Sequence, residues 1–217
     1  INPGEVAYDN GRLIYFKDLQ LEQDETGFND QFWASTGDRD LPLDYRRFTF
    51  GTSSDETIEG GIFEDHLYGE SGNDVLTGYD GDDYIEGGKG ADTLDGGNGI
   101  DTFYVEGTES AYDTFRGGDG EDIILGSKGN DTIRVHNFKG DDTVEIIDGG
   151  GASEDGGMDV LAGTAQSDTI DLTGTQLKNI HEIQLGDGAD TLRLHERKFD
   201  DTLDKIDGGT GEDTIKG

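Results

Sequence analysis

Carboxylates at a fixed spacing are the residues of this sequence best placed to do chemistry. An acidic residue recurs every nine positions, at Glu56, Asp65, Asp74, Asp83, Asp92 and Asp101. Glycine-rich stretches precede each acidic residue, so the groups available to bind a ligand are carboxylate oxygens and backbone carbonyl oxygens. Like charges brought close together repel. A hard cation relieves that repulsion, and calcium takes six to eight oxygen ligands at about 2.4 Å. The pattern therefore predicts binding of a hard cation such as calcium.

The acidic residues belong to a run of nine-residue blocks without insertions. Residues 50–103 divide into six blocks, from FGTSSDETI to DGGNGIDTF. The ninth residue of each block is large and apolar: Ile58, Leu67, Leu76, Ile85, Leu94 and Phe103. A disordered Gly/Asp-rich tract is the alternative, but it does not explain an apolar residue at every ninth position. A fixed short period instead indicates a stack of small repeated units.

Each block divides into a turn and a strand. The last three residues suit a short strand with one inward apolar side chain. The first six suit a tight turn, in which glycine permits positive φ and close approach of a ligand. Two blocks then make one coil of eighteen residues, and neighbouring strands stack about 4.8 Å apart. We therefore expect an all-β fold, a parallel β-roll or β-helix solenoid of stacked nonapeptide repeats.

Four stretches fit the pattern G-G-x-G-x-D in full, at 87–92, 96–101, 117–122 and 208–213. In tandem and in fixed phase they resemble the RTX (repeats-in-toxin) hemolysin-type calcium-binding repeat. The resemblance implies a parallel β-roll that several calcium ions organise, in a fragment of a larger secreted bacterial protein. The array ends at Lys216-Gly217 as if another repeat were opening, and we expect it to continue.

The resemblance also implies which residues hold calcium. In the family, turn carbonyls and the aspartate carboxylate bind each ion, which is shared between turns one coil apart. The best pairs of turns are 69–74 with 87–92, 60–65 with 78–83, 78–83 with 96–101, and 96–101 with 117–122. Phe63 replaces a turn glycine, so we expect the 60–65 turn to be distorted. The expected metal residues are Asp65, Gly69, Ser71, Gly72, Asp74, Gly78, Asp80, Gly81, Asp83, Gly87, Gly88, Lys89, Gly90, Asp92, Gly96, Gly97, Asn98, Gly99, Asp101, Gly117, Gly118, Asp119, Gly120, Asp122, Gly126, Lys128, Gly129 and Asp131, with Asp142, Asp190 and Asp213. Asp131 and these last three are second-rank candidates.

The repeats suggest three regions. Residues 1–49 carry no repeat and are rich in aromatic residues, so we expect an N-terminal cap or the end of a preceding domain. Residues 50–144 should form the calcium-binding RTX β-roll. Residues 145–217 are partly degenerate. Their apolar residues between Leu172 and Leu194 suggest longer strands in wider coils.

The composition, above all the net charge, excludes some classes of binding partner. The chain has 16 basic and 50 acidic residues, for a formal charge of −34, and 30% hydrophobic residues. Such a charge argues against nucleic acid and anionic membranes, and it should expand the chain unless a counter-charge is bound. No cysteine is present to form a disulfide. No run resembles a transmembrane helix or a signal peptide.

An enzyme is not expected. Carboxylates recur at every turn, so the repeat explains them better than a glycosidase pair does. The four histidines are scattered without metal-site spacing, and no G-x-S-x-G occurs. A polysaccharide lyase or epimerase on a β-helix would need catalytic groups that nothing here resembles.

The resemblance favours a calcium-dependent folding module of a type I-secreted protein, unfolded at cytosolic calcium and folded outside the cell. Its partners would be calcium and, through the full-length parent, the type I secretion machinery. The alternative is a spacer or interaction module of an adhesin or toxin. In that case residues 1–49 or 171–206 would bind a peptide, a glycan or a cell surface.

Overall fold

The computed structural model describes residues 6–9, 12–15, 48–108, 110–139, 144–150, 158–195 and 202–217. Regular secondary structure in these ranges consists of β-strands, without a helix. No described segment is therefore a helix of the length and apolarity that crossing a membrane requires. Of the predicted N-terminal cap (residues 1–49), the described parts are the backbone of the antiparallel pair β1–β2 and residues 48–49, and the rest lies outside the described residues.

The strands are short, with three to six residues each. In chain order they are β1 (Val6–Asp9), β2 (Arg12–Tyr15), β3 (Phe48–Phe50), β4 (Thr57–Gly61), β5 (His66–Tyr68), β6 (Val75–Asp80), β7 (Tyr84–Glu86), β8 (Thr93–Asn98), β9 (Thr102–Val105), β10 (Thr114–Asp119), β11 (Ile123–Gly126), β12 (Thr132–Arg134), β13 (Ile146–Asp148), β14 (Val160–Ala162), β15 (Thr169–Asp171), β16 (Gln176–Lys178), β17 (Glu182–Gln184), β18 (Thr191–Arg193), β19 (Lys205–Asp207) and β20 (Thr214–Lys216).

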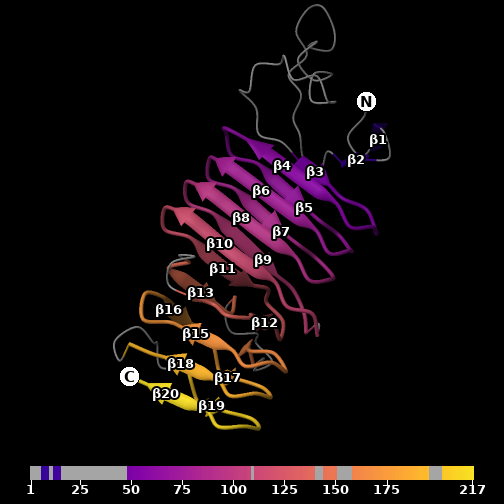
Figure 1. Ribbon diagram of the computed structural model, residues 1–217. Helices are drawn as coiled ribbons and strands as arrows, with labels where there is room; N and C mark the ends of the chain where they lie inside the picture. Colours follow the sequence, from indigo (N-terminus) through magenta and orange to yellow (C-terminus); the bar gives the residue numbers. More distant parts are fainter. Residues whose placement is uncertain are drawn as a thin grey trace, which may run out of the picture.

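Two parallel sheets form the N-terminal half of the solenoid. One has the order β10-β8-β6-β4, and the other the order β16-β13-β11-β9-β7-β5-β3. Figure 1 shows their strands stacked as successive rungs in two layers. Thr57 pairs with Val75 and Val75 pairs with Thr93, a shift of eighteen residues each time. The predicted parallel β-roll with eighteen-residue coils is confirmed.

The core is a row of single apolar side chains, one from each strand. The ninth residue of every block from 50 to 103 is at most 1% exposed. Phe115, Ile124 and Ile133 extend the same cluster towards the C-terminus. Phe103 and Phe115 meet edge to face with their ring centres 5.7 Å apart. The period-two alternation of a strand thus puts one apolar residue inside and leaves its neighbours on the surface.

The coils widen from β10 onward, where Thr93 pairs with Thr114, a shift of 21 residues. Thr132 pairs with Val160, a shift of 28 residues, and Val160 pairs with Glu182, a shift of 22. Here the sheets are β12-β14-β17-β19 and β15-β18-β20. The strands stay three residues long, so the prediction of longer strands was wrong. Leu172, Ile180 and Leu185 lie just past strand ends and are buried. The extra apolar residues therefore fill corners of the wide coils.

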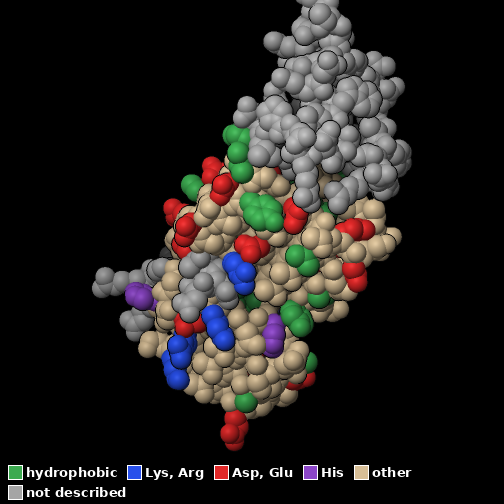
Figure 2. All heavy atoms as spheres, turned by 45° about the horizontal axis from the view of Figure 1, so that its top comes forward, with side chains coloured by type: hydrophobic (Ala, Val, Ile, Leu, Met, Phe, Trp, Pro, Cys, Tyr) green, Lys and Arg blue, Asp and Glu red, His purple; other side chains and the backbone are tan. Residues whose placement is uncertain are grey.

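Aromatic rings stack on the outer face of the seven-stranded sheet. Phe48 stacks on His66 with ring centres 4.5 Å apart, and Phe50 stacks on Tyr68 at 4.6 Å. His66 continues to Tyr84 at 5.3 Å. These rings are half-buried by one another, so they contribute packing between coils. On the face shown in Figure 2, acidic side chains line the flanks of the solenoid.

Candidate calcium sites

Aspartates from stacked turns are joined in columns by hydrogen bonds. The backbone amide of each donates to a carboxylate oxygen one coil further on. Asp65 donates to Asp83 Oδ1 at 2.7 Å, and Asp83 to Asp101 Oδ1 at 2.8 Å. One column comprises Glu56, Asp74, Asp92 and Asp113, and the other comprises Asp65, Asp83, Asp101, Asp122 and Glu145. In the wide coils Asp168, Asp190 and Asp213 form a third.

In five of these aspartates, the second carboxylate oxygen is buried without a hydrogen-bond donor. This holds for Oδ2 of Asp74, Asp83, Asp101, Asp122 and Asp190. All five side chains belong to residues that are at most 2% exposed. A buried charged oxygen without a partner carries a large desolvation cost. A cation in the turn would remove that cost, so the geometry fits a metal ion.

Glycine at the start of the turn lets oxygens converge there. A Cβ added to Gly78 would lie 2.1 Å from Asp83 Oδ2 and 2.6 Å from the carbonyl oxygen of Gly96. The first of these belongs to the same turn, and the second to the turn one coil away. No real Cβ tolerates such distances, so any side chain at position 78 would displace one oxygen or the other. The backbone thereby keeps the space between stacked turns lined with oxygen.

Within the described ranges, seven turns share one backbone shape. Their second and fourth residues have positive φ, as at Gly88 (91°) and Gly90 (132°). Glu70 (73°) and Tyr79 (82°) adopt the same conformation without being glycine. Counting six residues up to the aspartate, these turns are 69–74, 78–83, 87–92, 96–101, 117–122, 185–190 and 208–213. We call them open turns. All five of the unpartnered Oδ2 atoms named above lie in open turns.

Burial also opposes ionisation of these carboxyl groups. Burial first, and then the negative charges of column neighbours, raise the pKa of Asp83 and of Asp101 to about 7. The pKa of Asp122 rises to about 6 for the same reason, and that of Asp74 is raised as well. Hydrogen bonds from the neighbouring amides oppose the shift but do not cancel it. A bound cation would favour the ionised form at neutral pH.

The donor set fits calcium. Among the described residues, no three acidic or histidine side chains converge on one point. Carbonyl oxygens must therefore supply most ligands beside the aspartates. An all-oxygen set with many carbonyls suits calcium better than zinc, which prefers nitrogen and sulfur.

Comparison with protein families agrees with this geometry. A model described as the RTX calcium-binding nonapeptide repeat (4 copies) matches residues 50–81, 70–103, 110–134 and 200–217. These repeat matches and the β-solenoid fit an RTX hemolysin-type calcium-binding repeat protein. RTX nonapeptide repeats bind several calcium ions along their length, so this protein is a calcium-binding structural module. No curated protein matches the chain.

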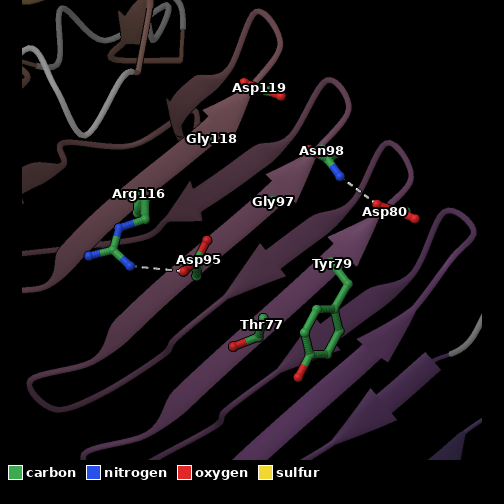
Figure 3. A pocket seen from close by; sticks show the side chains of 9 residues that line it. All are labelled: Thr77, Tyr79, Asp80, Asp95, Gly97, Asn98, Arg116, Gly118 and Asp119. Carbon is green, nitrogen blue, oxygen red and sulfur yellow. Dashed lines mark hydrogen bonds and ion pairs between the residues drawn. The ribbon is translucent and has the colours of Figure 1, made fainter.

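In these open turns, the side chain of the third residue points away from the space between stacked turns in which an ion would lie. Figure 3 shows Asp80, Asn98 and Asp119 at the ends of β6, β8 and β10, beside an open groove of about 650 Å³. Asn98 donates to Asp80 Oδ1 at 2.6 Å. The carbonyl of Asn98 accepts from the amide of Gly81 at 2.9 Å. The backbone of the third residue therefore joins neighbouring turns. Any contact of this residue with a metal ion is made by its backbone carbonyl oxygen.

The remaining predicted residues have different surroundings. Asp142 lies outside the described residues. Asp190 has the same buried Oδ2 as the strong candidates, and its amide donates to half-buried Asp213 at 3.0 Å. A Cβ added to Gly81 would meet the backbone carbon of Phe63 before its oxygen, whereas a Cβ added to Gly72 or Gly90 would meet a carbonyl oxygen first. The Phe63 peptide is turned, which agrees with the expected distortion of the 60–65 turn.

Sequence reasoning left five carboxylates out of the expected ligands, although hydrogen bonds place them in these columns or beside them. They are Glu56, Asp113, Glu145, Asp159 and Asp168. Each is followed two residues later by a buried apolar residue, such as Ile58 or Leu161. An acidic residue two places before an inward apolar residue was therefore the available signal, even where the glycines are missing.

Proposed function

We propose that this RTX protein is a calcium-dependent folding module of a type I-secreted bacterial protein. The chain stays unfolded at cytosolic calcium and folds on calcium binding outside the cell. The observation that carries the proposal is the set of buried, unpartnered carboxylate oxygens in the open turns. Those oxygens make the folded state unfavourable at neutral pH until a cation reaches them.

The calcium ions are assigned to pairs of open turns on the same edge. Turns 69–74 and 87–92 share one space, 78–83 shares another with 96–101, and 96–101 shares a third with 117–122. Hydrogen bonds between the aspartates of each pair support the pairing. When bound, calcium neutralises the carboxylates, and the aspartates and turn carbonyls hold it.

The expected free energy of calcium binding is large at extracellular calcium concentrations and small at cytosolic ones. Extracellular-type sites have dissociation constants of about 10⁻⁴–10⁻³ M. At roughly 2 mM calcium and a Kd of about 0.1 mM, one site stabilises by about 1.8 kcal/mol. The three assigned sites would together contribute about 5 kcal/mol, which is the lower end of the stability of a whole domain. At micromolar calcium this contribution nearly vanishes.

The module has a structural role and no catalytic one. RTX repeats on a β-solenoid are typically structural, and RTX proteins are typically secreted. A chain that remains expanded inside the cell suits passage through the type I machinery, which it would meet as part of its parent protein. Refolding outside then prevents its return.

Far-UV circular dichroism and size-exclusion chromatography test the proposal. The purified chain is compared in calcium-free buffer, in 2 mM calcium and in 2 mM magnesium, all near pH 7.5. We expect strand signal and a compact volume in calcium only, because magnesium demands near-octahedral geometry and dehydrates reluctantly. An equally compact, folded chain without calcium would refute the proposal.

A further inference from the structure

Three turns in the described part of the chain satisfy their carboxylate with groups of the protein itself. In turn 126–131, the amide of Ser127 donates to Asp131 Oδ2 at 2.7 Å. The hydroxyl of Ser127 lies 3.0 and 2.9 Å from the two carboxylate oxygens. The amide of Gly129 in turn donates to the Ser127 hydroxyl at 3.0 Å. The second residue thus links the fourth and the sixth residues of the turn.

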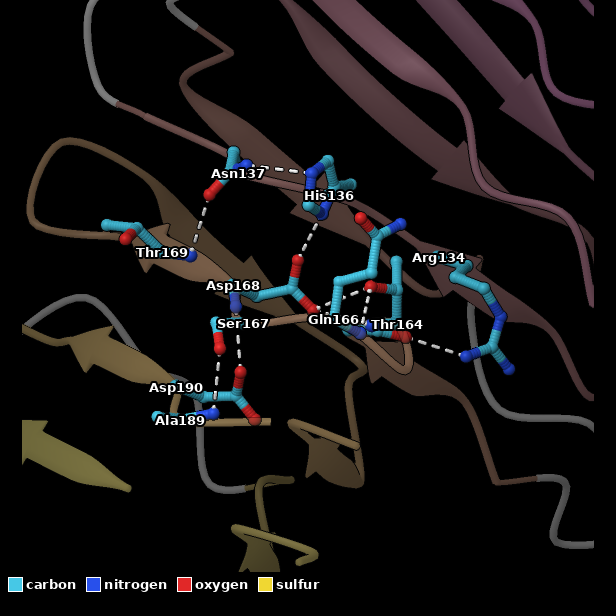
Figure 4. Close-up of polar contacts among 11 residues, drawn as sticks. Arg134, His136, Asn137, Thr164, Gln166, Ser167, Asp168, Thr169, Ala189 and Asp190 are labelled. Carbon is cyan, nitrogen blue, oxygen red and sulfur yellow. Dashed lines mark hydrogen bonds and ion pairs between the residues drawn. The ribbon is translucent and has the colours of Figure 1, made fainter. Parts of the chain in front are cut away.

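The same bonds recur in turns 163–168 and 51–56. Figure 4 shows Thr164 donating to Asp168 Oδ2, from its amide at 2.7 Å and from its hydroxyl at 3.1 Å. The Gln166 amide donates to the Thr164 hydroxyl at 3.0 Å. In turn 51–56, both the amide and the hydroxyl of Thr52 donate to the Glu56 carboxylate, the amide at 2.8 Å. The amide of Ser54 donates to the Thr52 hydroxyl at 3.3 Å. We call these three the hydroxyl-closed turns.

Their backbone differs from that of the open turns. None of the second and fourth residues of the hydroxyl-closed turns has positive φ, and this includes Gly129. Asp131 and Asp168 are 1% and 2% exposed, as buried as the open-turn aspartates. Yet both of their carboxylate oxygens have donors, since Gly107 serves Asp131 Oδ1 at 2.6 Å and His136 serves Asp168 Oδ1 at 2.5 Å. The electrostatic demand for a cation is met without one.

We propose that the second residue of each turn decides whether the turn takes calcium. Serine or threonine there closes the turn on its own carboxylate, and such a turn binds no ion. This inference rests on the proposed function, and it selects which turns perform it. It removes Gly126, Lys128, Gly129 and Asp131 from the expected ligands, and it assigns specificity to Thr52, Ser127 and Thr164.

Hydroxyl-closed turns nevertheless keep their place in the columns. The amide of Asp131 donates to Asp159 Oδ1 at 3.0 Å, and that of Asp168 to Asp190 Oδ1 at 2.7 Å. The stack of coils therefore continues through such a turn while the row of ions is interrupted. The chain can replace an ion locally by two donors, an amide and a hydroxyl.

The sequence offers a matched pair for the test. Turn 87–92 reads GGKGAD and turn 126–131 reads GSKGND, so they differ only at the second and fifth places. The variants are Gly88→Ser, Gly88→Ala and Ser127→Ala. Calcium per chain is measured by atomic emission after gel filtration in 2 mM calcium, and thermal unfolding is followed in the same buffer.

We expect Gly88→Ser to lose about one ion and to unfold at a higher temperature than Gly88→Ala, which loses the ion without gaining the hydroxyl. Ser127→Ala should keep the wild-type ion count and unfold at a lower temperature. A wild-type count in Gly88→Ser, or a changed count in Ser127→Ala, would overturn the inference. If both Gly88 variants fail to fold, the ion count and unfolding temperature of Ser127→Ala decide alone. A wild-type chain that binds no calcium would refute the proposed function itself, so the two failures are distinguishable.

Discussion

Replacing Asp83 by asparagine should change stability in opposite directions with and without calcium. Asp83 is 2% exposed, its Oδ1 accepts the Asp65 amide at 2.7 Å, and its Oδ2 has no donor. Burial raises its pKa from 3.8 to about 7. One pKa unit corresponds to about 1.4 kcal/mol, so ionised Asp83 costs the metal-free fold about 4 kcal/mol above pH 7.

Asp83→Asn removes that cost and keeps the shape. The amide oxygen can still accept from Asp65. The amide nitrogen takes the place of Oδ2, next to the Gly96 carbonyl that lines the same space. In calcium-free buffer at pH 7.5 we therefore expect a gain of up to about 4 kcal/mol. In 2 mM calcium the variant lacks a carboxylate ligand and should lose about 2 kcal/mol or more.

Urea unfolding followed by circular dichroism measures both effects. A fixed concentration of the osmolyte TMAO in every sample keeps the metal-free fold populated. Asp80→Asn is the control, because it makes the same charge change in the same turn on an exposed side chain. The control should differ little between the two buffers. Loss of stability in both buffers for Asp83→Asn, or equal behaviour of the two variants, would refute the reasoning about Oδ2.

Three further results are expected. Because the folded-state pKa values of Asp83 and Asp101 are raised to about 7, their contribution to metal-free stability is full below about pH 4 and is lost as pH rises through 7; circular dichroism in calcium-free buffer should show more folded chain at pH 5 than at pH 8, and the opposite trend would contradict this. Tyr79→Gly should stabilise the calcium-bound fold by up to about 1 kcal/mol in urea unfolding, because Tyr79 has a φ of 82°, whereas Tyr79→Ala keeps the strain and should not. Phe103→Ala should destabilise by about 3–5 kcal/mol, because the side chain is fully buried, while Ile100→Ala at a 56% exposed site should change thermal unfolding little.

The nine-residue period was enough to predict the first half of the fold. It placed one apolar residue per strand, and Ile58, Leu76 and Phe103 are buried as expected. The wide coils were harder, because the shift between paired strands there depends on how inserted residues pack. Leu172 and Leu185 looked like strand residues, but they are buried at corners beyond strand ends.

The candidate site was only partly predictable for a related reason. The pattern identified which aspartates recur, but not that one oxygen of each would be used between coils. Ser127 and Thr164 stand at a glycine position of the repeat, and their residue types were visible in the sequence. Their effect depends on the turn backbone, which places amide and hydroxyl on the carboxylate. A residue pattern alone does not contain that geometry.

In the columns, each open-turn aspartate contributes to stability in two ways, through a hydrogen bond between coils and through its charge. Removing calcium and mutating the aspartate affect these two contributions differently. One oxygen of each open-turn aspartate is fixed by the amide of a neighbouring coil, and this bond directs the other oxygen into the turn. Removing calcium leaves the bond and exposes the chain to its own charge. Removing the aspartate side chain deletes both the bond between coils and the carboxylate that would bind the ion. The hydroxyl-closed turns 126–131 and 163–168 keep the inter-coil bond and a buried carboxylate, yet have donors in place of the ion. The shape of the solenoid therefore follows from the bonds between coils, the turn glycines and the apolar row. In the proposed function, calcium supplies the positive charge that would make this shape stable at neutral pH.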